Sequence, residues 1–160
     1  MPKLTASHEE IKGQPPMAEG LYTIKLKGFK PQLSRKKDSV NLNPEIVIIN
    51  HAEHNDRRVF DSLNTKAKWA WKDFCGCFGV PCVEDASGGI EFPGEFAGPE
   101  NDPEKWQYVG PLLGQTGQAY LIQVQVLDTN GNPSTDKQGN THRNQVKYYV
   151  NQLQASAVGR

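Results

Sequence analysis

The chain has 160 residues, of which 36% are hydrophobic and 22% charged, and its formal net charge at pH 7 is zero. A domain of this length buries roughly 70% of the surface of its unfolded chain, so its stability requires neither disulfides nor a bound metal. The composition is too apolar for a disordered chain, and no apolar run approaches the roughly 20 residues of a membrane helix. We therefore expect one cytoplasmic domain over residues 1–160, with residues 1–19 as its leader and no membrane partner.

Basic residues are concentrated near the start of the chain. The stretch KLKGFKPQLSRKK, residues 25–37, contains six Lys and Arg residues, one phenylalanine and no acid. Residues 83–112 contain seven Asp and Glu residues against Lys105 alone, a charge of −6, so the rest of the chain carries +6. This separation of charge predicts an anionic partner for the basic stretch.

Alternation of apolar and polar residues predicts a strand that begins near Gly20. Its buried face is formed by Tyr22, Ile24 and Leu26. A strict period of two then places Lys25, Lys27 and Phe29 together on the outer face. Pro31 ends this strand and opens a loop.

Two strands are expected after the loop. Residues 40–50 contain the apolar run IVII, which indicates burial on both faces, and Pro44 argues for an edge position or a bulge near the start. A turn separates them from residues 57–63, a short strand with Val59 and Phe60 on opposite faces.

Two more strands are expected near the carboxyl end. The first covers residues 118–128 and aligns four side chains on one face, namely Tyr120, Ile122, Val124 and Val126. The second covers residues 143–150. Between them lies a long polar hairpin loop that contains three glycines or prolines and several Asp, Asn and Thr residues.

A change of period from two to 3.6 predicts one helix from Asn64 or Thr65 to Phe78. Its apolar stripe follows the spacing i, i+3, i+4, i+7 and i+11, with Ala67, Ala70, Trp71, Phe74 and Phe78. We expect a polar residue to cap its start, and Gly79 followed by Pro81 to end it.

Residues 83–112 are acidic, rich in Gly and Pro and without a sustained period. We expect an acidic excursion within the domain, with at most a short strand or turn. Three interpretations stay open, in this order: a solvated loop, a segment that docks a partner, and a mimic of a nucleic-acid strand that folds over the basic surface.

Three strands, a helix, an excursion and two strands make a mainly β chain. Five strands with a helix between the third and the fourth are typical of the OB-fold, a small barrel whose 1–2 and 4–5 loops and strand 2–3 face bind oligonucleotides. The two loops expected to be long and polar are these two loops. The order therefore favours a five-stranded OB-fold barrel with an acidic insertion over a β-sandwich of about seven strands.

Four strings strengthen this interpretation, namely GLYTIKL at 20–26, RRVFDSLN at 57–64, CGCFGV at 75–80 and THRNQVKYYV at 141–150. Their residues and their order resemble bacteriophage-encoded OB-fold single-stranded-DNA-binding proteins, over about two thirds of the chain. The resemblance implies a protein without enzymatic activity that coats single strands in DNA replication or recombination, in the host cytoplasm. It leaves open whether phage replication or recombination proteins, or further copies of the chain, are also partners.

Binding of a single strand requires cations along a groove for phosphates and exposed aromatic rings on which bases stack. The basic stretch supplies both in Lys25, Lys27, Phe29, Lys30, Arg35, Lys36 and Lys37. The alternative is a solvated strand face whose lysines protect an edge from aggregation. We favour nucleic acid, because solubility alone does not explain an outward phenylalanine between lysines.

Further candidates lie outside this stretch. Trp69 is about 200° around the helix from Trp71, so it either stacks on a base or packs under the acidic excursion, and packing is favoured. Tyr148 and Tyr149 point to opposite faces of the last strand, and we assign Tyr149 to the interface. Arg57, Arg58 and Lys147 are weaker candidates for phosphate contacts.

Catalysis, metals and cofactors have little support in the sequence. The paired spacing of structural zinc sites is absent from the three cysteines, Cys75, Cys77 and Cys82, and also from His51 and His54. Buried free thiols are therefore favoured. No phosphate-binding glycine loop or nucleophile elbow is recognisable. We therefore expect no enzyme and no cofactor. The alternative to DNA binding is a β-barrel or β-sandwich protein that binds other proteins or forms part of a virion. Its basic strand would face another protein.

Overall fold

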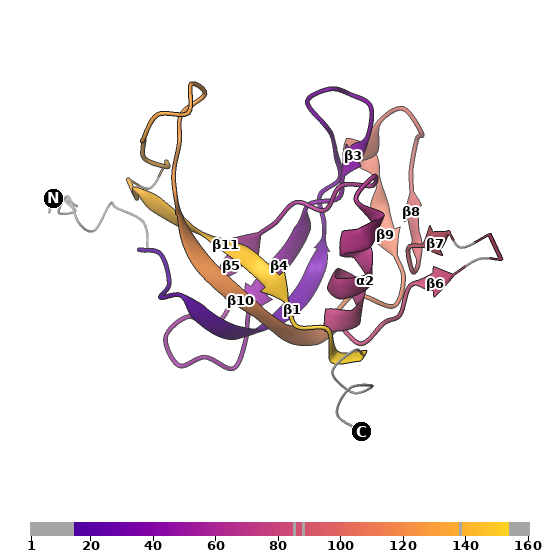
Figure 1. Ribbon diagram of the computed structural model, residues 1–160, viewed down its shortest axis with the longest axis horizontal. Coiled ribbons are helices and arrows are strands. Elements are labelled where there is room, and N and C mark those ends of the chain that lie inside the picture. Colours follow the sequence, from indigo (N-terminus) through magenta and orange to yellow (C-terminus); the bar gives the residue numbers. More distant parts are fainter. Residues whose placement is uncertain (1–14, 85, 88, 138, 154–160) are drawn as a thin grey trace, which may run out of the picture.

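The computed structural model describes residues 15–84, 86–87, 89–137 and 139–153. It is mainly β, with a five-stranded antiparallel sheet that curls into a half barrel beside one helix (Figure 1). The strand order is β11-β10-β1-β4-β5. These strands are β1 (Gly20–Phe29), β4 (Pro44–Ile48), β5 (Arg58–Phe60), β10 (Thr116–Gln125) and β11 (His142–Tyr149). Helix α2 (Lys68–Cys77) follows the third strand of this sheet in the chain.

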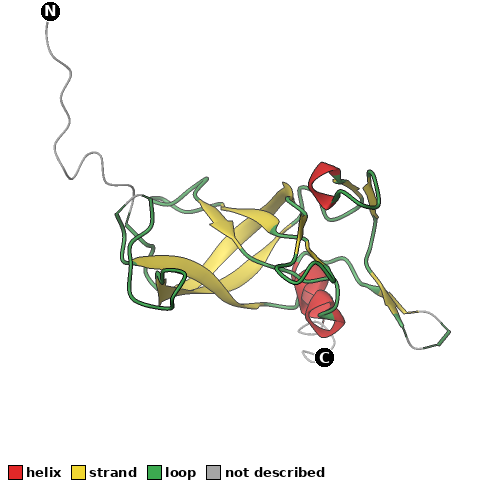
Figure 2. Ribbon diagram, turned by 90° about the horizontal axis from the view of Figure 1, so that it is seen from above, coloured by secondary structure: helices red, strands yellow, loops and turns green. Residues whose placement is uncertain are grey.

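Three small hairpins surround the sheet. They pair β2 (Gln32–Leu33) with β3 (Val40–Asn41), β6 (Val83–Glu84) with β7 (Ile90–Glu91), and β8 (Glu95–Ala97) with β9 (Gln107–Val109). A short 3-10 helix, η1 (Pro103–Lys105), lies between β8 and β9. Seen from above, α2 and η1 lie at one end of the molecule, and the β6–β7 hairpin projects beyond them (Figure 2). Residues 83–112 are therefore more regular than the single short strand or turn expected from the sequence.

The expected strand 40–50 is divided in two. Val40 and Asn41 belong to the β2–β3 hairpin, whereas β4 begins at Pro44 after Asn43, whose φ is +44°. Of the two alternatives for Pro44, the edge position is wrong, because β4 pairs with both β1 and β5, whereas a bulge does lie near the start of β4, in the neighbouring strand β1. Pro44 is tolerated since it is the first residue of the strand.

A β-bulge at Lys27 reverses the expected direction of Phe29. The register passes from Leu26 opposite Ile46 to Gly28 opposite Glu45, so β1 contains one more residue than β4 here. An extra residue shifts the alternation by one, and Phe29 turns to the core side with Leu26. The expectation that Phe29 lies outward with Lys25 and Lys27 is therefore wrong.

A second bulge lies in the last strand, β11, at Lys147. Tyr120 lies opposite Tyr148, whereas Leu121 lies opposite Val146. The buried face of β10 contains Ala119 and Leu121, and the face that Tyr120 shares with Ile122 and Val124 points outward. Tyr149 lies opposite Ala119 and is directed to the core.

Helix α2 is held by its apolar stripe rather than by a polar cap. Trp71, Phe74 and Phe78 are buried as expected, but no side chain caps the helix start, where Ala67 stands. The end is the expected glycine stop: Gly79 has φ +74°, and the N–H groups of Gly79 and Val80 donate to the carbonyls of Gly76 and Cys75, a Schellman motif.

The two end strands of the sheet, β5 and β11, approach each other. The Tyr149 hydroxyl donates a 2.8 Å hydrogen bond to Oδ2 of Asp61, the residue after β5. At the other end of the sheet, the buried Met17 receives side-chain hydrogen bonds from Gln123 and Asn144 at its carbonyl. Within the described part of the chain, no helix has the length and hydropathy needed to cross a membrane.

Candidate nucleic-acid interface

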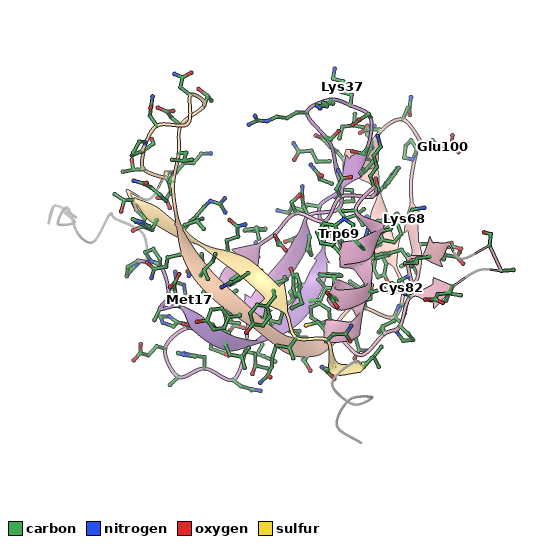
Figure 3. All side chains as sticks on the ribbon, viewed as in Figure 1. Met17, Lys37, Lys68, Trp69, Cys82 and Glu100 are labelled. Atoms are coloured by element: carbon green, nitrogen blue, oxygen red, sulfur yellow. The ribbon has the colours of Figure 1, made fainter. Side chains whose placement is uncertain are left out.

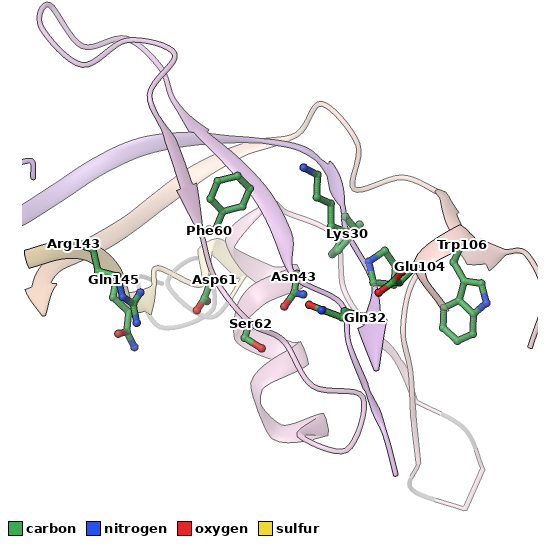
Figure 4. Close-up of a pocket in the computed structure, with 12 residues that line it drawn as sticks. Lys30, Gln32, Asn43, Phe60, Asp61, Ser62, Glu104, Trp106, Arg143 and Gln145 are labelled. Atoms are coloured by element: carbon green, nitrogen blue, oxygen red, sulfur yellow. The ribbon is translucent and has the colours of Figure 1, made fainter. Parts of the chain in front are cut away.

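Two adjoining cavities follow the outside of the half barrel where β5 and β11 meet. One has a volume of about 690 Å³ and the other about 530 Å³. Phe60 of β5 and Arg143 of β11 line both cavities, which therefore adjoin, and we call the two together the seam groove. Figure 4 shows its larger half, with Arg143 and Gln145 on one side, Phe60 in the middle and Trp106 at the far end.

An exposed aromatic ring lies at the centre of the seam groove. Phe60 is 49% exposed although it belongs to a strand, because Val59 takes the buried position of that strand. The ammonium group of Lys30 lies 5.9 Å from the centroid of the Phe60 ring, a cation–π distance. Trp106 adds a second, half-buried ring, and its indole N–H donates to the carbonyl of Pro99 at 2.6 Å.

The lining of the groove has more cations than acids. Its cations are Lys30, Arg57, Arg58, Lys137 and Arg143, and its acids are Asp61, Glu104 and Asp136. Burial raises the pKa of Asp61 above its ordinary value, and the hydrogen bond from Tyr149 and the charge of Arg143 oppose that rise. A basic groove around an aromatic ring can bind a phosphate backbone while a base stacks on the ring.

Two of the expected cations are neighbours in the chain, Arg57 directly before β5 and Arg58 as its first residue, but their side chains differ in exposure. Arg57 is half-buried; its guanidinium donates to the carbonyl of Pro15 at 2.8 Å and lies 3.3 Å from Nδ1 of His54. Arg58 is exposed on the outer face, opposite Val47 of β4. Arg58 is therefore the more available phosphate contact of the two.

The tip of the β2–β3 hairpin is exposed and basic. Arg35, Lys36 and Lys37 form it, and Lys37 has φ +57°. Asp38 behind the tip accepts a hydrogen bond from Ser34 and pairs with Lys66 at 3.1 Å. The hairpin and the 126–141 loop rise on the same side of the sheet, with Lys37 at the end of the hairpin (Figures 1 and 3).

Two expected interface aromatics pack on the core side, and one of them, Phe29, also lines the larger half of the seam groove. The Phe29 ring packs among the rings of Phe74, Phe92, Phe96 and Tyr108, with centroids 4.9–6.0 Å away. Tyr149 packs on Phe74 and Phe78 in addition to its bond to Asp61. The assignment of Tyr149 rather than Tyr148 to the outer face is wrong, because the Lys147 bulge changes the phase of the strand.

The remaining candidates lie outside the lining of the groove. Trp69 is 81% exposed on α2, so the favoured packing under the acidic segment is wrong (Figure 3). Lys25 is half-buried on the outer face of β1, between Val47 and Thr116. Lys27 and Lys147 are both exposed and occupy the two bulges.

The acidic segment 83–112 packs against the core, which contradicts its first interpretation as a solvated loop. Phe92 and Phe96 contact the Phe29 ring, and Leu112 is fully buried. Its carboxylates at Glu84 and Asp102 pair with Lys72 and Lys105. The segment contributes Glu104 and Trp106 to one end of the seam groove.

All three cysteines are free thiols; Cys75 and Cys77 are buried, and Cys82 is half-buried. Burial raises the pKa of Cys75 far above its ordinary value and that of Cys77 to about 12, so both are thiols at neutral pH. His51 uses Nδ1 to accept N–H groups of Glu53 and His54. Among the described residues, no group of three or more His, Cys, Asp or Glu side chains is arranged to bind a metal ion.

Sequence reasoning missed the centre of the groove. Phe60 and Arg143 come from strands 83 positions apart in the chain, and no local pattern brings them together. One signal was available: alternation with the apolar Val59 places Phe60 on the same face as Arg58. Comparisons of the chain with protein-family models, curated proteins and solved structures found no match.

Proposed function

We propose that this chain is an OB-fold protein that binds single-stranded DNA along the seam groove with little sequence preference, without catalysis or a cofactor. The bases stack on Phe60 and Trp106, and phosphates contact the surrounding cations. The resemblance noted in the sequence implies a role in phage DNA replication or recombination, which is part of the proposal.

The strand order supports the fold assignment. In an OB-fold the first strand pairs with the second and the fourth, and the barrel closes where the third strand meets the fifth. Here β1 lies between β4 and β10, and β5 and β11 approach at the ends of the sheet. The helix follows β5, and the two polar connections, 30–43 and 126–141, are the 1–2 and 4–5 loops.

The observation that carries the function is the exposed ring of Phe60 between cations. The ring is half exposed within a concave surface whose lining is mainly basic, an arrangement that fits a base stacked on the ring between phosphate contacts. Stacking on such a ring accepts any base, which explains binding with little sequence preference.

A titration of fluorescent oligo-dT tests the proposal. If about three to five phosphates are contacted, the logarithm of the affinity falls against the logarithm of the salt concentration with a slope of roughly −2 to −3.5. Phe60→Ala should lose roughly 1–3 kcal/mol of binding free energy, and Phe60→Tyr should retain it. Duplex DNA and RNA competitors establish the preferred strand.

Two results would contradict this function. The first is a slope near zero in the salt titration, which would mean that the protein makes no phosphate contacts. The second is equal affinity of wild type and Phe60→Ala at unchanged stability, which would mean that no base stacks on Phe60. Retention of a protein partner together with no oligonucleotide binding would favour the rival, an interaction or virion-structural protein whose basic surface faces another chain.

A further inference from the structure

The sheet face beyond the groove presents a row of exposed rings and apolar side chains. Leu21 of β1 lies opposite Tyr120 of β10, which in turn lies opposite Tyr148 of β11. The two tyrosine rings are stacked, with centroids 5.4 Å apart and planes at 14°. Leu21 is 51% and Tyr148 49% exposed. Packing of the barrel does not require this arrangement, because Tyr149 supplies the core contact of β11.

The strands of this face carry only cations, although Glu19, which precedes β1, accepts the N–H of Gln123 in β10 at 2.8 Å. The three adjacent strands β1, β10 and β11 contain Lys25, Lys27, Arg143 and Lys147 and no aspartate or glutamate. Lys147 directly precedes Tyr148 and is exposed. A stacked aromatic pair beside cations fits a nucleic-acid strand better than a neutral or basic protein surface.

The face is continuous with the seam groove along β11. Arg143 and Gln145 line the groove, and Lys147 and Tyr148 follow on the same strand. Tyr148 lies five positions after Arg143 on this strand, a path of roughly 16 Å. A single strand that leaves the groove along β11 therefore reaches the tyrosine pair.

A second copy of the chain is a poorer occupant. Three half-exposed side chains supply about 300 Å² of apolar surface, whereas a stable interface needs about 800 Å² from each partner.

We propose that Tyr148, supported by Tyr120, is a second stacking site for bases of a single strand that extends out of the seam groove, with Lys147 as its phosphate contact. This inference rests on the proposed function. It makes the binding site longer than the groove alone, so it applies only to oligonucleotides that span both.

Affinities for two lengths of oligo-dT test it, one of about five nucleotides and one of about fifteen, within the range of site sizes of single OB-folds. Tyr148→Ala should weaken binding of the long oligonucleotide by about 5-fold to 100-fold and leave the short one unchanged. Tyr148→Phe should match wild type on both. Lys147→Gln should reduce the magnitude of the salt slope for the long oligonucleotide by about 0.7. The melting temperature of each variant controls for folding.

The outcomes distinguish failure of the second stacking site from failure of the proposed single-strand binding. If wild type binds neither length, the proposed function itself fails. If wild type binds but Tyr148→Ala leaves the long oligonucleotide unaffected, or weakens both lengths equally, the second site is wrong. Light scattering that shows Tyr148→Ala breaking a dimer, with unchanged affinity for DNA, would assign the face to a second copy. Cross-linking of a 5-iododeoxyuridine-labelled long oligonucleotide to Tyr148 gives independent support, and cross-linking confined to the groove overturns the proposal.

Discussion

The hydroxyl of Tyr149 donates a 2.8 Å hydrogen bond to the Asp61 carboxylate and so connects β11 to the residue that follows β5. These are the two end strands of the five-stranded sheet, and no backbone ladder joins them. Burial raises the pKa of Tyr149 well above its ordinary value, so the phenol stays a donor. A side-chain bond therefore helps to close the half barrel beneath the seam groove.

Tyr149→Phe should lower the free energy of unfolding by about 1–3 kcal/mol, because the buried Asp61 carboxylate loses its donor while the ring remains. Denaturant unfolding measures the change. Tyr148→Phe is the matched control, since its half-exposed hydroxyl should contribute less than about 0.5 kcal/mol. Equal stability of the two variants would show that the Asp61 bond does not stabilise the closure.

Stability should depend on pH through Asp61. Its pKa is raised in the folded state above the ordinary value of 3.8, chiefly by burial. The folded chain therefore binds more protons than the unfolded chain between these two values, and the contribution of Asp61 to stability is full below 3.8 and lost as pH rises through the folded pKa. Asp61→Asn should remove this part of the pH profile. Thermal unfolding of both proteins from acid to neutral pH checks it, and parallel profiles would contradict the raised pKa.

Phe29→Ala should destabilise the fold by roughly 3–5 kcal/mol, because the ring packs among four aromatic rings from α2 and residues 92–108. Phe60→Ala is the control and should change the free energy of unfolding by less than about 1 kcal/mol, since its ring faces the groove. Denaturant unfolding of both variants distinguishes a Phe29 ring on the core side from one that faces outward. If Phe29→Ala were stable but bound DNA more weakly, the Phe29 ring would face outward, as the alternation of the sequence predicts.

The basic hairpin tip should contribute charge but not stacking. Replacing Arg35 and Lys36 with glutamine should reduce the magnitude of the salt slope by about 1.4 if both contact phosphates, and should leave the melting temperature unchanged. Lys72→Gln is the control, because this exposed lysine lies on α2, outside the lining of the groove, and pairs with Glu84. A double variant with the wild-type slope would show that the strand does not reach the hairpin.

Local sequence patterns located the five strands of the main sheet and one helix, although the helix begins at Lys68, after the expected start, and the small strands of residues 83–109 were not expected. The alternation of Tyr22, Ile24 and Leu26 and the helical spacing of Trp71, Phe74 and Phe78 each report one buried face, which depends only on near neighbours in the chain. The glycine stop of the helix is local in the same sense. For that reason these expectations are confirmed.

Tertiary structure decided which side chains face outward and which meet. A single extra residue at Lys27 or Lys147 inverts the face of every residue after it, and alternation carries no mark of such a bulge. Phe29 and Tyr149 thereby entered the core, and Tyr148 was left outside. The seam groove depends on the curling of the sheet, which brings Phe60 to Arg143 across 83 positions of the chain; only long-range packing of the half barrel could place these two residues together.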